Sequence, residues 1–92
     1  MIKSFDHKGL EDFYYEGTIK GIQAKHAVRL RRLLDQLEHA ISTADMDFSG
    51  SGLHSLKGSL KDYWAVKVSG NWRMTFRFED GHAYVVGYQD YH

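Results

Sequence analysis

The sequence predicts an α+β fold in which two N-terminal helices pack on a small, mostly antiparallel β-sheet. Three observations support this. Residues 23–42 repeat apolar side chains with a helical period, Asp80-Gly81 separates two segments that favour strands, and the segment before that turn, NWRMTFRF, is basic and aromatic. The expected order of elements is βααβββ. The 92 residues contain no proline, linker or internal repeat, which predicts one domain spanning 1–92.

The N-terminal segment favours a strand followed by a short helix. Residues 1–5, MIKSF, are expected to form the first strand. Asp6 is expected to cap a helix that carries Leu10 and Phe13 on its apolar side and stops at Gly17. The second helix is longer and amphipathic. Its apolar stripe consists of Ala27, Leu30, Leu34, Leu37 and Ile41, flanked by Leu33 and Ala40.

The opposite face of the second helix is polar, and we interpret it as a solvated face or as a docking surface. It carries Lys25, Arg29, Arg32, Gln36 and His39. Residues 42–52, STADMDFSGSG, are rich in Gly, Ser and Asp and are predicted to form a loop. The rest of the chain favours strands.

The Asp80-Gly81 turn predicts a two-residue hairpin, because both central positions tolerate positive φ. A regular register then pairs Glu79 with His82, Phe76 with Val85, Arg73 with Tyr88 and Asn71 with Asp90. Side chains alternate between faces along a strand. The core face is therefore expected to hold Trp72, Met74, Phe76, Phe78, Ala83 and Val85. The polar face is expected to hold Arg73, Thr75, Arg77, Tyr84, Tyr88, Asp90 and His92.

A preceding strand is expected at 63–68, YWAVKV, and a three-residue turn at 69–71 connects it to the hairpin. We prefer three residues because this length places Trp64, Val66 and Val68 on the core face beside Trp72, whereas a two-residue turn would expose them.

The composition excludes several classes of function and predicts where the charges lie. Twelve Lys and Arg balance twelve Asp and Glu, but five cations and no acid lie between Lys20 and Arg32, and five cations with one acid lie between 50 and 78. The protein is thus expected to be neutral overall and basic on one side. The absence of cysteine excludes thiolate chemistry and Cys-based zinc sites. No segment is suited to a signal peptide or a membrane span, so we expect a soluble, cytoplasmic protein.

Four short motifs carry a family resemblance. GLHSLKG at 52–58, NWR at 71–73, FRF at 76–78 and DYH at 90–92 resemble the HigB branch of the RelE/ParE toxin superfamily, and the likeness spans essentially the whole chain. It implies a compact RelE-like α+β toxin that enters the ribosomal A site, cleaves mRNA there and is silenced by a helix-turn-helix antitoxin of the HigA type. The chain departs from the family pattern at Ala65, at Gly87 and in its neutral charge.

The resemblance also implies a catalytic set and a way of cutting RNA. The matching residues are His54, Lys57, Arg73, Asp90, Tyr91 and His92. The 2′-hydroxyl of RNA attacks the adjacent phosphate, without a cofactor or metal. His54, His92 and Asp90 are candidates for base and acid, and their roles stay open. Lys57 and Arg73 suit the phosphate, and Tyr91 suits a base or the 2′-hydroxyl.

Further contacts with RNA or the ribosome are expected from a second group of cations. These are Lys20, Lys25, Arg29, Arg32, Lys61 and Arg77. The remaining histidines, at 7, 26, 39 and 82, lack the spacing of a metal site. The toxin alone is expected to be a monomer, with a heterotetramer possible in the antitoxin complex.

Two other functions remain open at this point. A ParE-like toxin that poisons DNA gyrase has the same fold without needing these nuclease residues. A non-catalytic RNA- or protein-binding module keeps the basic face and does not depend on His54, Asp90 or His92. An ordinary salt bridge between Arg73 and Asp90 also accounts for their expected positions on one face.

Overall fold

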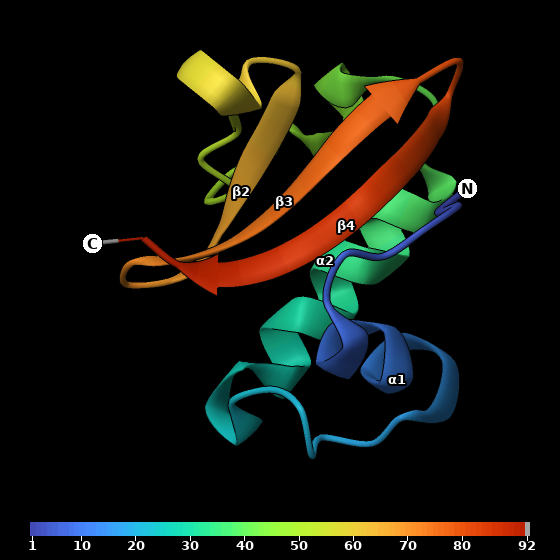
Figure 1. Ribbon diagram of the computed structural model, residues 1–92, viewed down its shortest axis with the longest axis vertical. Coiled ribbons are helices and arrows are strands. Elements are labelled where there is room, and N and C mark those ends of the chain that lie inside the picture. The colour runs from blue at the N-terminus through green and yellow to red at the C-terminus, as the bar shows by residue number, and fades with distance from the viewer. Residues whose placement is uncertain (92) are drawn as a thin grey trace.

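The computed structural model describes residues 1–91 and contains two α-helices and a four-stranded antiparallel sheet (Figure 1). The helices are α1 (Lys8–Glu16) and α2 (Ala27–His39), and the strands are β1 (His54–Ser55), β2 (Tyr63–Ser69), β3 (Trp72–Glu79) and β4 (His82–Asp90). The strands lie side by side in chain order. The predicted α+β class is confirmed, and no helix within residues 1–91 is long and apolar enough to cross a membrane.

The N-terminal segment differs from the predicted strand. It forms only two isolated parallel bridges to β4, Ile2 with Ala83 and Phe5 with Val86. Asp6 does not cap α1, because its N–H still donates to the carbonyl of Val86 at 2.8 Å and so belongs to the edge of the sheet. His7 caps the helix instead.

The second helix is shorter than predicted. A 3-10 turn, Ala24–His26, precedes α2, and the helix ends at His39 because Ala40 adopts an extended conformation. The apolar stripe is confirmed at Leu30, Leu33, Leu34 and Leu37, all fully buried. The placement of Ile41 in that stripe was wrong: its exposed fraction is 79%, because it lies beyond the helix end.

The core lies between α2 and one face of the sheet. Val66, Met74 and Phe76 are fully buried there, and Trp64 packs against them at the margin. Ser69 pairs with Trp72, so the turn has two residues rather than three, and a register shift between Lys67 and Ser69 accommodates Val68 in the core, 7% exposed. The predicted core placement is confirmed, although an irregularity in β2 achieves it rather than a longer turn.

The β3–β4 hairpin begins as predicted, with Glu79 opposite His82, and then changes register. Between Arg77 and Thr75 the pairing skips one residue of β4, where Val85 has a φ of +49°. The backbone N–H of Val85 donates to the hydroxyl of Ser4 at 2.8 Å. This is a β-bulge, which puts one extra residue into β4 and exchanges the faces of every residue after it.

The bulge overturns the predicted register beyond Val85. Arg73 lies opposite Gln89 rather than Tyr88, and Asp90 lies opposite Trp72 rather than Asn71. Tyr88, expected on the polar face, is 5% exposed and belongs to the core, where Val86 takes the place predicted for Val85.

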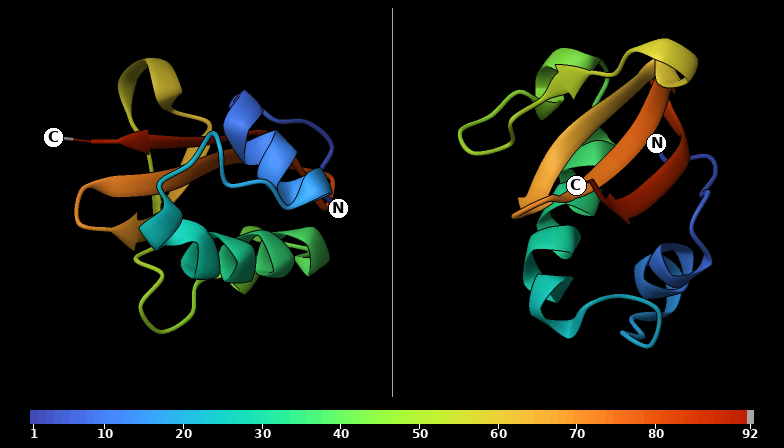
Figure 2. Two further views of the ribbon diagram at one scale, coloured as in Figure 1. Left: turned by 90° about the horizontal axis from the view of Figure 1, so that it is seen from below. Right: turned by 60° about the vertical axis from the view of Figure 1, so that its left-hand side comes forward.

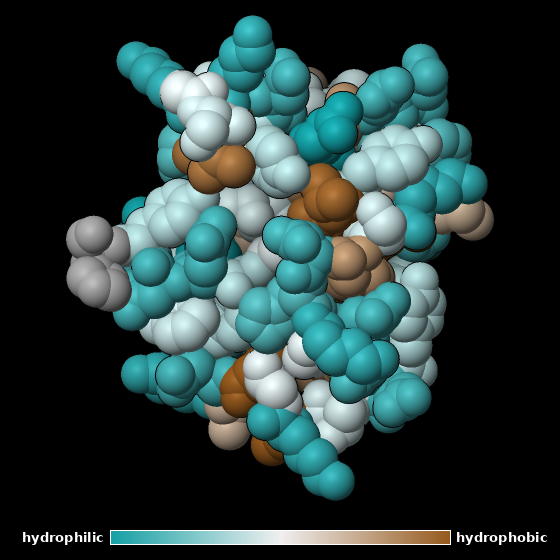
Figure 3. All heavy atoms as spheres, in the orientation of Figure 1, coloured by the Kyte–Doolittle hydropathy of each residue, from teal (hydrophilic) through white to brown (hydrophobic). Residues whose placement is uncertain are grey.

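The layers are simple. Figure 1 shows α2 behind the sheet and α1 below it, next to β4, and the two views in Figure 2 agree. Within residues 1–91, no helix crosses the face of the sheet that points away from α2; we call it the open face. Figure 3 shows this side of the molecule, where hydrophilic side chains surround a few apolar ones.

Candidate active site

The open face has a floor of small residues. The register aligns His54 of β1, Ala65 of β2, Thr75 of β3 and Gly87 of β4 in one row across the sheet. Ala65 is fully buried and Thr75 is 4% exposed. A Cβ atom on Gly87 would lie 2.9 Å from the Thr75 hydroxyl oxygen, so the glycine makes room for the threonine. The row is therefore a shallow floor rather than a ridge.

Polar and aromatic side chains flank this floor. Toward the C-terminus of β4, the next row holds Lys67, Arg73 and Gln89. Toward the other end, the pairings are Tyr63 with Arg77 and Arg77 with Tyr84. Within the described chain the open face thus presents cations and aromatic rings on either side of a low centre, an arrangement suited to a polyanion with flat bases.

Arg73 is held in place by backbone carbonyls. Its Nη1 donates to the carbonyl oxygen of Gly70 at 2.7 Å and to that of Trp72 at 3.1 Å. These bonds fix the guanidinium at the β2–β3 turn and leave its other N–H groups for a ligand. Lys67, directly opposite on β2, is exposed. Lys67 was not among the predicted site residues, although the alternation of side chains along β2 places it on the face of Arg73.

The C-terminal residues continue along β3. The backbone N–H of Tyr91 donates to the carbonyl of Asn71 at 2.8 Å, and the Tyr91 hydroxyl accepts from the Gln89 amide at 3.1 Å. The bulge therefore places Tyr91, rather than Asp90, on the face of Arg73. Asp90 is the last residue of β4, and its side chain is exposed. His92 lies outside the described residues. The prediction that Asp90 shares the face of Arg73 was wrong for this reason.

His54 lies on the open face, two strands away from Arg73. Its Nδ1 is 3.0 Å from the carbonyl oxygen of Gly52. A carbonyl only accepts, so Nδ1 carries the proton, and Nε2 of the neutral ring has the lone pair. The side chain is exposed, so Nε2 of this tautomer faces solvent. Strands about 4.8 Å apart place the His54 backbone roughly 10 Å from that of Thr75, with the low floor between them.

Lys57 lies apart from the C-terminal group. The N–H of Leu56 donates to the carbonyl of Tyr63 at 2.9 Å, and Tyr63 is the first residue of β2. Lys57 follows Leu56 and therefore lies past this end of β2, far from Arg73. The structure thus brings Arg73 and Tyr91 together on the open face at one end, whereas Asp90 belongs to the other face of β4. It places His54 across the floor from them and Lys57 at the opposite end.

The second group of predicted cations does not form one patch. Arg77 lies on the open face, and Lys61 lines a hollow beside it. Arg29 and Arg32 lie on α2, in the other layer, and Lys20 and Lys25 are exposed between the helices. Arg29 donates to the carbonyls of Gly50 at 2.8 Å and Lys67 at 3.0 Å, which is a structural role.

A buried polar cluster lies on the core side of β4. His26 is 2% exposed, and its Nδ1 is 2.6 Å from the hydroxyl of Tyr88, which also accepts from the N–H of Gln23 at 3.3 Å. Burial lowers the pKa of His26 and raises the pKa of Tyr88. Within residues 1–91, no group of three His, Asp or Glu side chains has the geometry of a metal site.

The antiparallel sheet, with α2 on one face and cations and aromatic rings on the other, agrees with the class that the sequence matches, the RelE-like toxins. Residues 3–92 match the family model of HigB-like toxins, described as the RelE-like toxin HigB of type II toxin–antitoxin systems. The chain is 39% identical to the endoribonuclease HigB of Proteus vulgaris over 92 residues, the full length of both. It therefore belongs to the HigB-like toxin family.

A solved structure shows the same fold. The YoeB dimer from Staphylococcus aureus superposes with a TM-score of 0.62, over 99% of this chain and 94% of that one, at 15% identity. The predicted family is confirmed, and so is the predicted RelE-like fold. A toxin of a type II system has an antitoxin as its partner.

Proposed function

We propose that this type II toxin is an endoribonuclease that cuts mRNA in the ribosomal A site, using the open face of its sheet. The observation that supports the proposal is the position of Arg73, Tyr91 and His54 on one face of the sheet, around a low floor. Membership in the HigB-like family and the 39% identity to an endoribonuclease support the same activity.

The chemistry that we propose is an internal transfer at phosphorus. The 2′-oxygen loses its proton and bonds to phosphorus, the bond from phosphorus to the 5′-oxygen breaks, and that oxygen takes up a proton. The products are a 2′,3′-cyclic phosphate and a 5′-hydroxyl, and neither water nor an oxidant takes part. The two proton transfers fall to His54 and to the C-terminal residues Asp90 and His92. Each positioned acid or base contributes about 10²- to 10⁴-fold.

Cations stabilise the charge that develops on the five-coordinate phosphorus. Arg73 is suited to this, because two carbonyls already orient its guanidinium and the remaining N–H groups match two phosphate oxygens. Lys67 and Lys57 add point charges along the face and neutralise neighbouring phosphates. Tyr91, tied to Gln89, stacks on a base or orients the 2′-hydroxyl.

We propose further that the partner is an antitoxin of the HigA type with a helix-turn-helix, and that the site of action is the cytoplasm, where ribosomes are found. The toxin alone is a monomer in this proposal and joins a heterotetramer in the antitoxin complex. A bound antitoxin blocks entry to the A site either by covering the open face or by adding bulk to α2.

A purified translation reaction with primer extension along the mRNA tests the proposed function. We expect cuts at the A-site codon that need ribosomes, and we expect Asp90→Ala, His92→Ala and His54→Ala each to lower the rate at least 10²-fold. The Asp90 and His92 variants should relieve growth arrest while still folding and binding antitoxin. Full toxicity in both variants, or inhibited gyrase with intact mRNA, would reject the nuclease.

A further inference from the structure

A hollow of about 160 Å³ lies where the N-terminal segment leaves the edge of β4. Its lining consists of Asp6, His7, Thr75, Gly87, Tyr88 and Gln89. Three of these residues belong to the open face, and Gln89 is directly opposite Arg73. The hollow is therefore adjacent to the proposed site of cleavage, although neither His7 nor Gln89 is among the predicted site residues.

The hollow exists because the edge of β4 is covered only as far as Val86. The N–H of Val86 donates to the carbonyl of Ser4 at 3.0 Å, and its own carbonyl accepts from Asp6 at 2.8 Å. The chain then turns into α1. Backbone N–H and C=O groups point alternately to the two sides of a strand, so those of Tyr88 point away from β3, as those of Val86 do. Tyr91 is three residues after Tyr88, and its N–H points toward β3, where it donates to Asn71.

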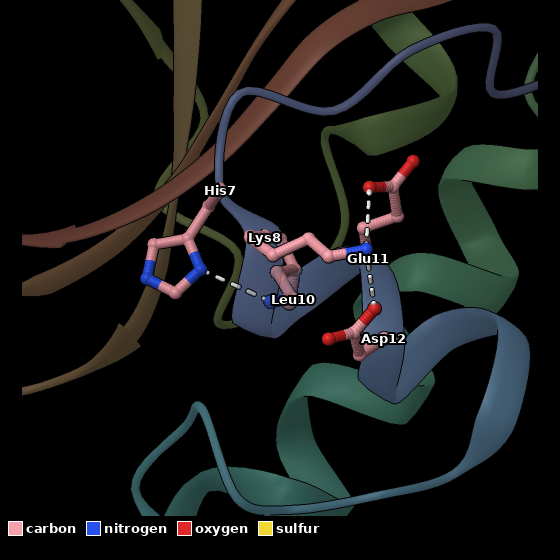
Figure 4. Close-up of polar contacts among 5 residues, drawn as sticks. All are labelled: His7, Lys8, Leu10, Glu11 and Asp12. Carbon is pink, nitrogen blue, oxygen red and sulfur yellow. Dashed lines mark hydrogen bonds and ion pairs between the residues drawn. The ribbon is translucent and has the colours of Figure 1, made fainter.

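His7 supplies one wall and a directed donor. Its Nδ1 accepts the N–H of Leu10 at 3.0 Å, so the neutral ring carries its proton on Nε2. Figure 4 shows that nitrogen on the side of the ring turned away from α1. The ring meets that of Tyr88 edge to face, with 5.3 Å between centroids. The capping bond thus fixes both the orientation and the tautomer of His7.

The charge of the lining selects the ligand. Asp6 is its only formally charged residue within the described chain, and no Lys or Arg contributes, so a phosphate is disfavoured. The donors and acceptors are instead those of the His7 ring, the Gln89 amide, the Thr75 hydroxyl, the Asp6 carboxylate and the edge of Tyr88. Flat heterocycles with donors and acceptors on their edges match such a set. At about 30 Å³ for each water molecule, the volume suits one small ring system rather than two.

We propose that this hollow binds one base of the RNA substrate and that His7 and Gln89 thereby set part of the sequence preference. The inference rests on the proposed nuclease function, since the RNA reaches the hollow only if its phosphates pass Arg73. Gln89 joins the two regions: it pairs with Arg73 across the sheet and donates to the hydroxyl of Tyr91. The phosphate and the base of one nucleotide then occupy neighbouring positions on the open face.

The variants are chosen to keep the fold. His7→Asn retains a good N-cap for α1, because asparagine also accepts the N–H bond, while it removes the ring and Nε2 from the hollow. Gln89→Ala changes an exposed side chain. His39→Asn is the matched control, since His39 is an exposed histidine on α2, in the other layer, where its Nδ1 contacts the carbonyl of Asp35 at 2.8 Å.

The experiment measures cleavage rates in the translation reaction on a set of mRNAs that differ only in the three bases of the A-site codon. We expect His7→Asn and Gln89→Ala to lower the rate on the favoured codons about 10-fold and to change unfavoured codons less, so that the ratio between codons shrinks. That factor corresponds to the loss of one good hydrogen bond to a base. His39→Asn should keep the codon ratio of the wild type. The melting temperatures of all three variants should stay close to that of the wild-type protein.

The outcomes separate the two proposals. A wild-type protein that leaves every mRNA intact rejects the nuclease function, and the assignment of a base to the hollow is rejected with it. A wild-type protein that cuts, together with variants that cut more slowly at an unchanged codon ratio, rejects the hollow alone. If His7→Asn melts early, the exposed Gln89→Ala decides the result, and an unchanged ratio in that variant overturns the inference.

Discussion

At the scale of single residues, the open face depends on side chains whose geometry the backbone sets. Arg73 is the clearest case, because two carbonyl oxygens near the β2–β3 turn hold its guanidinium. His54 is similar, since the carbonyl of Gly52 selects its tautomer. In the proposed function both residues are therefore oriented before RNA binds, and preorganised groups stabilise a transition state without reorganisation.

Arg73→Ala is expected to lower the rate of RNA cleavage about 10²- to 10³-fold, because it removes a preorganised charge at the phosphate. Arg73→Lys should recover only part of that loss, since an ammonium lacks the planar fork for two phosphate oxygens. Single-turnover cleavage measures both. Arg32→Ala, an exposed arginine on α2, is the matched control and should cut normally. Equal rates in all three variants would contradict the role given to Arg73.

Gly87 and Thr75 form a steric pair in the floor of the site. Gly87→Ala is expected to lower the free energy of unfolding by about 1–3 kcal/mol, because the new Cβ would lie 2.9 Å from the Thr75 hydroxyl oxygen. Adding Thr75→Ala removes that oxygen and should recover part of the loss. A double-mutant cycle in denaturant measures the coupling. Simple additivity of the two changes would show that the contact does not limit the packing.

At the scale of elements, most of the fold was predictable from local signals. The Asp80-Gly81 turn set the start of the hairpin, and the period of Leu30, Leu34 and Leu37 set the helix that covers the sheet. The bulge at Val85 was not predictable, because valine rarely adopts positive φ and no glycine marks the position. The bulge depends on contacts with the N-terminal segment, including the hydroxyl of Ser4.

The same bulge determines which site residues could be placed on the correct face from the sequence. The motifs correctly indicated His54 and Arg73 as side chains of one face, since the pairings that join them are regular. They could not show that Tyr91 replaces Asp90 beside Arg73, because one extra residue in β4 reverses every later side chain. His7 was missed for another reason: its position depends on a helix cap and on where the chain leaves β4.

Within the bulge, two adjacent valines are expected to respond differently to glycine. Val85→Gly should change the free energy of unfolding by no more than about 1 kcal/mol, because relief of the left-handed conformation offsets the lost side chain. Val86→Gly should cost about 3 kcal/mol or more, because Val86 is fully buried in the core. Chemical denaturation measures both. Equal losses would contradict the assigned positions of the two residues.

At the scale of the whole molecule, buried and partly buried hydrogen bonds join the segment before α2 to the sheet, and join α2 to α1 and to the N-terminal segment. His26 and Gln23 contact the Tyr88 hydroxyl from the segment before α2, and Glu38 of α2 accepts from the Tyr14 hydroxyl and from the N–H of Ile2. Burial raises the pKa of Tyr14, reinforced by its bond to Glu38. Burial opposes ionisation of Glu38, but its hydrogen bonds prevail and its pKa is lowered. The layers are thus held by groups that titrate outside neutral pH.

These groups define a window of maximal stability. The pKa of His26 is lower in the folded chain than in the unfolded chain, so the unfolded chain binds the proton at a higher pH. The free energy of unfolding therefore decreases as the pH drops below about 6.5. The lowered pKa of Glu38 adds a further loss below about 4.5. The raised pKa of Tyr88 has the opposite sign: the unfolded chain ionises first, and stability falls as the pH rises above about 10. The window between about 6.5 and 10 should therefore show a plateau.

The double variant His26→Phe with Tyr88→Phe should flatten the acid side of this profile. It removes both partners of the buried bond, so neither group of this pair is left without its partner, and it removes the lowered pKa of His26 and the loss of stability that this causes below about pH 6.5. One proton accounts for at most about 1.4 kcal/mol per pH unit. Melting in denaturant at several pH values measures the slope, with His39→Gln, an exposed histidine, as the control that should keep it. A double variant with the acid slope of the wild type would assign that slope to other groups and leave the His26–Tyr88 pair with a packing role only.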